Sequence, residues 1–175
     1  METFKELFSE TLKDIYYAEK AILKALPKMV NQASSRKLQT AFAKHEKETE
    51  GQIKRLDQVF ELLGERASGK KCPAIDGIIE EAEELMKEAK DETIRDAAML
   101  AAAQSVEHYE ISRYGTLVAW AEKMEMPRAA KLLEATLEEE KLTDEKLTEL
   151  AESEINVAAE EGDEEERQRL KSASR

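Results

Sequence analysis

Four long stretches of the chain have the residue spacing of amphipathic helices, and polar side chains interrupt the apolar face of every one. The interruption is clearest in residues 93–126, where Glu107 and Glu110 share a face with apolar residues such as Leu100 and Leu117. Residues three and four positions apart lie on the same side of a helix, so both carboxylates belong to the apolar face. An ionised carboxylate facing a core is costly unless it is protonated, paired or bound to a cation. The fold must therefore bring compensating groups to these positions.

The other three stretches are interrupted in the same way near their middles. They cover residues 3–31, 35–64 and 127–159. The polar residues on their inward faces are, in chain order, Glu19, His45, Glu48 or Thr49, Gln52, Glu140 and Asp144. Four helices with polar positions at their centres predict a shared polar site inside the fold.

Local signals set the ends of these helices. Thr3 followed by Glu6 has the spacing of a capping box, and Gly64 is a typical C-terminal stop. Pro127 is well placed in the first turn of a new helix. Pro27 lies inside the first helix, and we expect it to kink the last turn or end the regular helix early, because proline removes a backbone donor.

The composition favours helix over strand along the whole chain. The 175 residues include only 3 prolines, 6 glycines and 5% aromatic residues. With 41% hydrophobic residues, the chain is long enough to build one core. We therefore predict an all-α protein with one domain over residues 1–160 and a charged C-terminal tail or short helix over residues 161–175. Residues 65–77 are expected to form a loop, and residues 76–90 a short helix within a crossover connection.

The charge of the chain argues against two classes of partner. Its formal net charge is −12, whereas nucleic acids and anionic membranes bind clustered lysine and arginine. No apolar run approaches the ~20 residues of a membrane span, and the N-terminus has charges where a signal peptide needs an apolar segment. We therefore expect a cytoplasmic protein that binds neither nucleic acid nor membrane. The single cysteine, Cys72, cannot form a disulfide within the chain.

Distances along the chain place the polar residues at one height of a helical bundle. In an antiparallel hairpin, residues equally far from the turn lie level with each other. Three pairs meet this condition about the turns near residues 33 and 126: Glu19 with Glu48, Glu110 with Glu140, and Glu107 with Asp144. Two such hairpins packed around a pseudo-twofold axis would hold these carboxylates in one interior layer. So many like charges are not buried together without cations.

The donor atoms at these positions favour particular metals. An oxygen-rich site with one imidazole suits iron or manganese, whereas zinc more usually recruits cysteine or several histidines. Di-iron and di-manganese bundles have one Glu from each of two helices and Glu-x-x-His from each of the other two. This chain matches only in part, because Gly51 and Thr143 occupy the expected histidine positions. We predict two Fe ions, or alternatively Mn, held by these candidate ligands: Glu19, His45, Glu48, Glu107, Glu110, Glu140 and Asp144.

Several of these assignments have an alternative. Glu107 and Asp144 have the chemistry to accept hydrogen bonds from ligands instead of binding the metal. A single histidine on an apolar face, such as His45, is often an ordinary core residue. Weaker candidates for the site are Gln52, His108, Tyr16 and Tyr114.

Four sequence motifs carry a family resemblance across nearly the whole chain. They are residues 14–20 (DIYYAEK), residues 48–56 (ETEGQIKRL), residues 107–111 (EHYEI) with Tyr114-Gly115, and residues 139–147 (EEKLTDEKL). Together they resemble the YciF-like (YciE/YciF) proteins, a bacterial stress-associated branch of the ferritin-like superfamily. The resemblance implies a ferritin-like four-helix bundle with added short helices, a homodimer, and a di-iron centre similar to that of rubrerythrin.

Three functions fit these observations. The first is a non-haem di-iron or di-manganese oxidoreductase that reduces O2 or peroxide under stress, with ferroxidation as a further version. The second is a non-catalytic stress-response binding or structural dimer in which the metal stabilises the bundle. The third is iron storage in a cage. A substrate hydroxylase is less attractive, because nothing in the sequence indicates a pocket for an organic molecule.

Overall fold

The computed structural model describes the backbone of residues 1–173 and the side chains of all of these except residues 163–170 and 173. Its helices are α1 (Phe4–Gln32), α2 (Arg36–Leu63), α3 (Pro73–Glu88), α4 (Glu92–Lys123), α5 (Pro127–Leu150) and α6 (Asn156–Ala173), with a π-helical turn at Ala151–Ile155. No strand occurs over this described range, which confirms the all-α class. Residues 174–175, at the end of the predicted tail, lie outside it.

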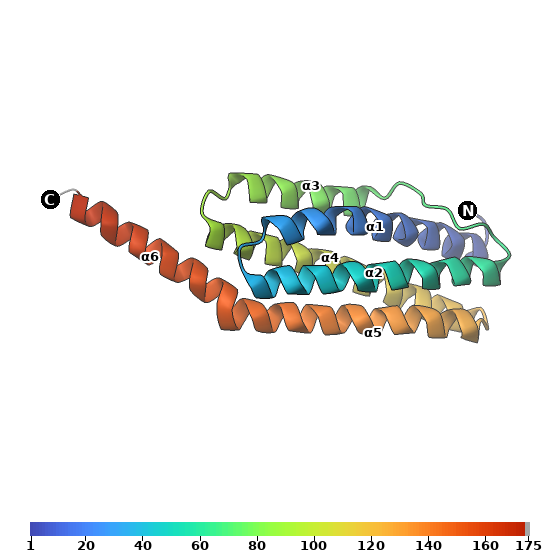
Figure 1. The fold of residues 1–175 in the computed structure, drawn as a ribbon. Coiled ribbons are helices and arrows are strands. Elements are labelled where there is room, and N and C mark those ends of the chain that lie inside the picture. The colour runs from blue at the N-terminus through green and yellow to red at the C-terminus, as the bar shows by residue number, and fades with distance from the viewer. Residues whose placement is uncertain (174–175) are drawn as a thin grey trace.

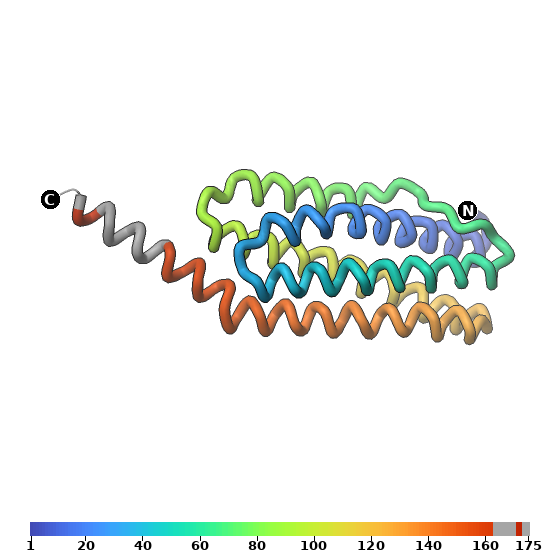
Figure 2. The backbone as a smooth tube through the Cα atoms, viewed as in Figure 1, coloured from blue at the N-terminus to red at the C-terminus, as the bar shows by residue number. Residues whose placement is uncertain are grey.

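Two antiparallel hairpins build the bundle. Helices α1 and α2 form the first hairpin, and α4 and α5 form the second (Figure 1). Between them, a loop over residues 64–72 and then α3 carry the chain back along the length of the bundle, as the tube in Figure 2 shows. Helix α3 packs against α4 and α1. The predicted ferritin-like arrangement, with a crossover that contains a short extra helix, is confirmed.

The ends of the long helices follow the local signals in the sequence. At the start of α1, the Thr3 hydroxyl accepts a hydrogen bond of 3.1 Å from the Glu6 amide, and the Thr3 amide donates to the Glu6 carboxylate at 3.2 Å. At the end of α2, Gly64 adopts φ 72°, a left-handed conformation that glycine accepts without strain. Pro127 lies in the first turn of α5. These signals are local, so they do not depend on the rest of the fold.

Helix α1 runs through Pro27 to Gln32, close to the expected end at residue 31, so the proline does not end the regular helix early. Two other expected boundaries differ from the structure. Helix α3 begins at Pro73, so the loop is shorter than predicted, because a proline fits the first helical turn as well here as in α5. The helix predicted over residues 127–159 is regular only to Leu150. Beyond the π-helical turn the chain remains helical as α6, which points away from the bundle (Figure 1).

Asp96 of α4 fixes the first hairpin against the second. Its side chain is 3% exposed and accepts three hydrogen bonds from the turn between α1 and α2. The donors are the Ser34 amide at 2.9 Å, the Ser34 hydroxyl at 2.6 Å and the Ser35 amide at 2.7 Å. The turn is therefore held at a set height on α4, which also sets the height of the α1 and α2 side chains inside the bundle.

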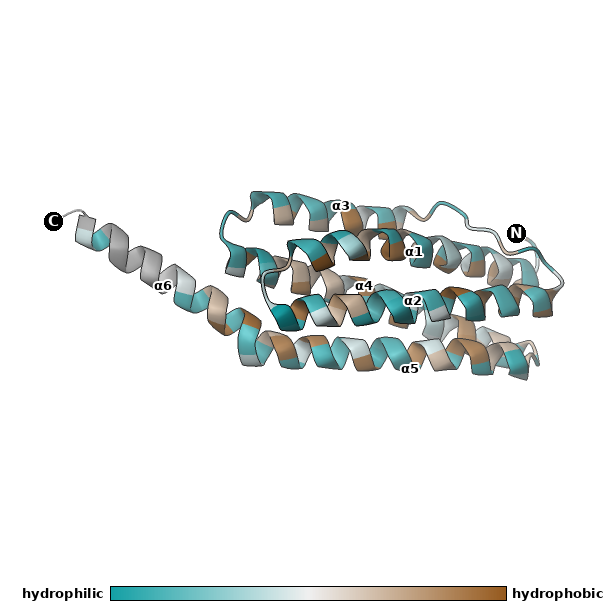
Figure 3. Cartoon of the chain, in the orientation of Figure 1, coloured by the Kyte–Doolittle hydropathy of each residue, from teal (hydrophilic) through white to brown (hydrophobic). Residues whose placement is uncertain are grey.

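An apolar core fills the bundle above and below the polar layer. Hydrophilic and hydrophobic residues alternate along each long helix, as expected for amphipathic helices (Figure 3). Phe8, Leu12, Phe60 and Leu117 are completely buried, and each such side chain contributes about 1.5–3 kcal/mol of burial free energy. Within the described residues, none of the helices has the length and apolar character needed to cross a membrane.

Candidate metal centre

Four side chains from three helices meet in the middle of the bundle. They are His45 of α2, Glu107 and Glu110 of α4, and Glu140 of α5. One ligand atom from each lies within 4.8 Å of one from every other, and all four side chains are buried. Glu107 and Glu110 are one helical turn apart, so they present two carboxylates to the same space. The structure thus brings four of the seven predicted ligands together.

Glu19 of α1 adds a fourth helix to this cluster. Its side chain is completely buried, and its Oε1 accepts a hydrogen bond from the Tyr114 hydroxyl. Its Oε2 has no hydrogen-bond partner. Burial, followed by the negative charge of Glu140, raises the pKa of Glu19 well above its usual value. Glu19 therefore lies close enough to the other carboxylates to share their electrostatic environment.

The other three carboxyl groups also have raised pKa values. Burial is the largest cause in each case. The neighbouring Glu19 charge further raises the pKa of Glu110 well above its usual value. The pKa of Glu107 is also well above its usual value, and that of Glu140 rises from 4.5 to about 7. Without a cation, the cluster resists full ionisation at neutral pH.

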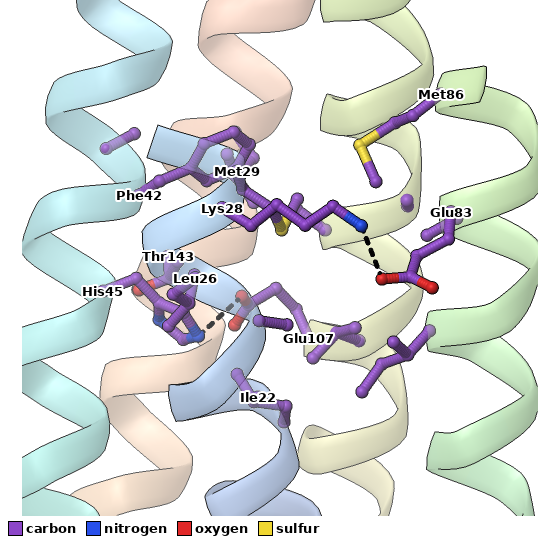
Figure 4. A pocket seen from close by; sticks show the side chains of 18 residues that line it. Ile22, Leu26, Lys28, Met29, Phe42, His45, Glu83, Met86, Glu107 and Thr143 are labelled. Carbon is purple, nitrogen blue, oxygen red and sulfur yellow. Dashed lines mark hydrogen bonds and ion pairs between the residues drawn. The ribbon is translucent and has the colours of Figure 1, made fainter. Parts of the chain in front are cut away.

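His45 is neutral in this environment. Burial, and then the charge of Lys44, lowers the pKa of its imidazole to about 4. Its Nε2 lies 3.4 Å from Glu107 Oε1 (Figure 4), but neither ring nitrogen has a hydrogen-bond partner. At neutral pH this contact is not an ion pair, because the ring carries no charge. A neutral imidazole with a free nitrogen is the form that binds a metal.

Buried polar atoms without hydrogen-bond partners are concentrated in this cluster. Among the described side chains, the buried nitrogen and oxygen atoms that lack a hydrogen-bond partner belong to six residues: Glu19, His45, Gln52, Glu107, Glu110 and Glu140. Buried polar groups in folded proteins nearly always have partners, and each one left without a partner costs about 1–3 kcal/mol. The oxygen-rich donor set with one imidazole fits iron or manganese.

Glu48 and Asp144 lie outside the four-residue group. The Glu48 side chain is 24% exposed and forms an ion pair with Lys44, one turn earlier on α2. The next residue, Thr49, takes the fully buried position instead. The Asp144 side chain is 21% exposed, and its Oδ2 lies 3.2 Å from His108 Nε2. Both carboxylates are near the site, since Glu48 raises the pKa of Glu140 and Asp144 raises that of Glu107. Their ligand roles stay predictions.

A pair of hydrogen-bonding residues on α2 holds the α5 side of the site. Gln52 donates to Glu140 through its amide, and Arg55 donates to both oxygens of Glu139, with its Nη1 at 2.7 Å from Oε2. Gln52 was a weak candidate from the sequence, and Arg55 was missed. The spacing gives only part of the signal, because residues 52 and 55 are one turn apart on α2 but the two consecutive glutamates that they contact lie on another helix.

Comparison with known proteins identifies the family to which this chain belongs. The sequence model of the family described as "Domain of unknown function (DUF892)" matches residues 3–160. The chain belongs to this family. Protein YciF of Escherichia coli (strain K12) is 48% identical over 161 residues, which cover 91% of this chain and 97% of YciF. The predicted YciF-like resemblance is confirmed.

Solved structures of similar proteins have the same fold as this DUF892 chain. The crystal structure of the E. coli stress protein YciF matches with a TM-score of 0.85 and 48% identity, covering 89% of this chain and 99% of that one. YcfI of Rhodopseudomonas palustris, described as a proposed structural protein, matches with a TM-score of 0.83 and 52% identity over 84% and 94% of the two chains. A protein of Xanthomonas campestris shares the fold at 23% identity, with a TM-score of 0.73.

Proposed function

We propose that the buried cluster binds two metal ions, iron or manganese, and that the protein uses them for redox chemistry with O2 or peroxide. The observation that carries this proposal is the set of buried ligand atoms on four helices that have no hydrogen-bond partner. The charge of the cluster supports a count of two ions. Glu19, Glu107, Glu110 and Glu140 would carry four negative charges when ionised, which two divalent cations balance.

The residues of the cluster would have different roles in such a site. His45, Glu107, Glu110 and Glu140 would hold the metal ions, with Glu19 completing the set from α1. When bound, the metals would supply the electrons for reduction of O2 or peroxide. The partly exposed Glu48 and Asp144 are further candidate ligands at the edge of the site.

Neighbouring residues orient the ligands and hold protons. The Tyr114 phenol donates to Glu19, and its pKa is raised well above its usual value by burial and by the nearby carboxylates, so it keeps its proton. Gln52 holds Glu140 through its amide, and the Arg55–Glu139 pair fixes the adjoining turn of α5. The surrounding apolar core keeps bulk water from the ligands, which strengthens electrostatic interactions within the site.

A stress-associated role for this chain rests on its relative, since the E. coli protein is described as a stress protein. The alternative is a non-catalytic structural dimer in which the metal only stabilises the bundle, a role in line with the description of the R. palustris protein. The homodimer and the cytoplasmic location stay predictions from the sequence.

Metal content and redox response together test the proposal. Protein loaded with Fe(II) or Mn(II) and freed of loose ions should retain metal, and reduced iron-loaded protein should change its absorbance when O2 or peroxide is added. Glu110→Gln should lose metal, whereas the matched control Glu138→Gln, on an exposed residue of α5, should retain it. Retained metal without a redox response would favour the structural alternative. A chain without tightly held metal would contradict both.

A further inference from the structure

An apolar pocket runs into the bundle and ends at the candidate metal centre. Side chains from helices α1 to α5 line it, and two of its lining residues, His45 and Glu107, are cluster residues (Figure 4). Its cavity volume is about 50 Å³. Because both ring nitrogens of His45 and the Oε2 atom of Glu107 lack partners, the pocket ends at atoms available for metal binding.

The pocket wall is almost entirely apolar. It includes Ile22 and Leu26 of α1, Phe42 of α2, and Ala103 and Val106 of α4. Lys28 of α1 and Glu83 of α3 are the charged residues that line it besides the cluster, and they neutralise each other in an ion pair of 2.7 Å. Both of these side chains are about half exposed, so the pair lies at the outer surface (Figure 4).

Size and polarity together select the occupant. A water molecule needs a cavity volume of roughly 10–15 Å³, and drug-sized ligands need pockets of roughly 300–1,000 Å³. A cavity of about 50 Å³ therefore admits molecules of a few atoms only. Apolar cavities stay dry, which excludes hydrated cations and disfavours polar peroxide. Dioxygen is small and apolar, and reduced iron at the metal centre would be its reductant.

We infer that this pocket is the binding and entry site for dioxygen, and that O2 passes along it to the His45 and Glu107 side of the metal centre. The use of O2 there rests on the proposed function. The pocket itself is a property of the metal-free chain, so it is testable without metal. The inference also chooses O2 over peroxide as the reactant that the fold is built to admit.

Xenon is a suitable probe, because it binds dry apolar cavities. Crystals of the metal-free protein under xenon pressure should show a xenon atom in the pocket. Ala103 is four residues before Glu107 on the same face of α4, so Ala103→Leu should fill the inner end and abolish the xenon site. The matched control is Ala101→Leu, which makes the same change on an exposed residue that does not line the pocket. If Ala103→Leu does not fold, Ala82→Leu on α3 narrows the same pocket from a half-buried position.

The reaction of the reduced, iron-loaded protein provides the second measurement. Ala103→Leu should slow oxidation by O2 about tenfold, equal to about 1.4 kcal/mol in barrier height. Oxidation by peroxide, and by O2 in Ala101→Leu, should stay unchanged. An empty pocket under xenon, equal slowing for both oxidants, or an organic molecule found in the pocket would overturn the inference. A chain that binds xenon but no metal would refute the proposed function and the use of O2, whereas a missing xenon site would leave metal binding intact.

Discussion

Replacing Glu140 with glutamine should stabilise the metal-free protein at alkaline pH and, at the same time, weaken metal binding. Glu140 is completely buried, and burial is the main reason that its pKa rises from 4.5 to about 7. Glutamine has nearly the same size, carries no charge, and retains an oxygen that accepts the hydrogen bond from Gln52. The substitution thus removes a buried charge without removing the contact.

The direction of the pH effect follows from proton binding. Because the pKa of Glu140 is higher in the folded chain than in the unfolded one, the folded state binds more protons between pH 4.5 and about 7. The stability that protonated Glu140 provides is complete below pH 4.5 and is lost as pH rises through about 7. This rise of the Glu140 pKa from 4.5 to about 7 corresponds to about 3 kcal/mol. The pKa values of Glu19, Glu107 and Glu110 are raised in the same direction, so these groups add to the loss of stability at high pH.

Urea unfolding with a chelator present measures this effect. At about pH 8 the free energy of unfolding of Glu140→Gln should exceed that of the unaltered protein by about 3 kcal/mol, and at about pH 5 this excess should fall to about 1 kcal/mol. Glu138→Gln is the control, because Glu138 is exposed and pairs with Lys141, one turn away. If Glu140→Gln is no more stable at pH 8, or if its advantage persists unchanged at pH 5, Glu140 is not a buried carboxylate that strains the metal-free fold.

Three further outcomes follow from the same structure. Tyr114→Phe should lower the free energy of unfolding by about 1–3 kcal/mol in urea, because Glu19 then lacks its donor; an unchanged value would argue against that contact. Asp96→Ala should lower the free energy of unfolding by more than about 2 kcal/mol in the same assay, because the Ser34 and Ser35 donors lose their acceptor. Equal stability would contradict the role of Asp96 in holding the turn between α1 and α2 against α4. Free metal at 100 times its Kd should stabilise the chain by about 2.7 kcal/mol for each site that it fills, seen as a higher Tm that a chelator reverses; no shift would contradict binding to the folded state.

Patterns within single helices predicted much of this fold. The capping box at Thr3 and Glu6, the stop at Gly64 and the helix start at Pro127 depend on neighbouring residues only, and all three were confirmed. The inward positions of Glu19 and Glu140 followed from helical periodicity. The π-helical turn after α5 has no comparable local signal, so the predicted helix was longer than the regular α5.

On α2, helical periodicity alone could not decide which of two adjacent residues faces the site. Adjacent residues differ by about 100° around a helix, so the spacing left Glu48 and Thr49 as alternatives. The packing of α2 buries Thr49 and leaves Glu48 partly exposed beside Lys44. The Arg55–Glu139 pair joins two helices and is therefore invisible in either helix alone. The apolar pocket was also unpredicted, because it forms only where side chains from five helices meet.

The most direct test of the account is a crystal structure of the metal-loaded protein with anomalous data at the iron or manganese absorption edge. We predict about two anomalous peaks between α1, α2, α4 and α5. They should lie within bonding distance of His45, Glu107, Glu110 and Glu140, with Glu19 completing the set. No peak in the cluster, or peaks only on the acidic outer surface, would contradict the claim that these buried carboxylates form a metal centre.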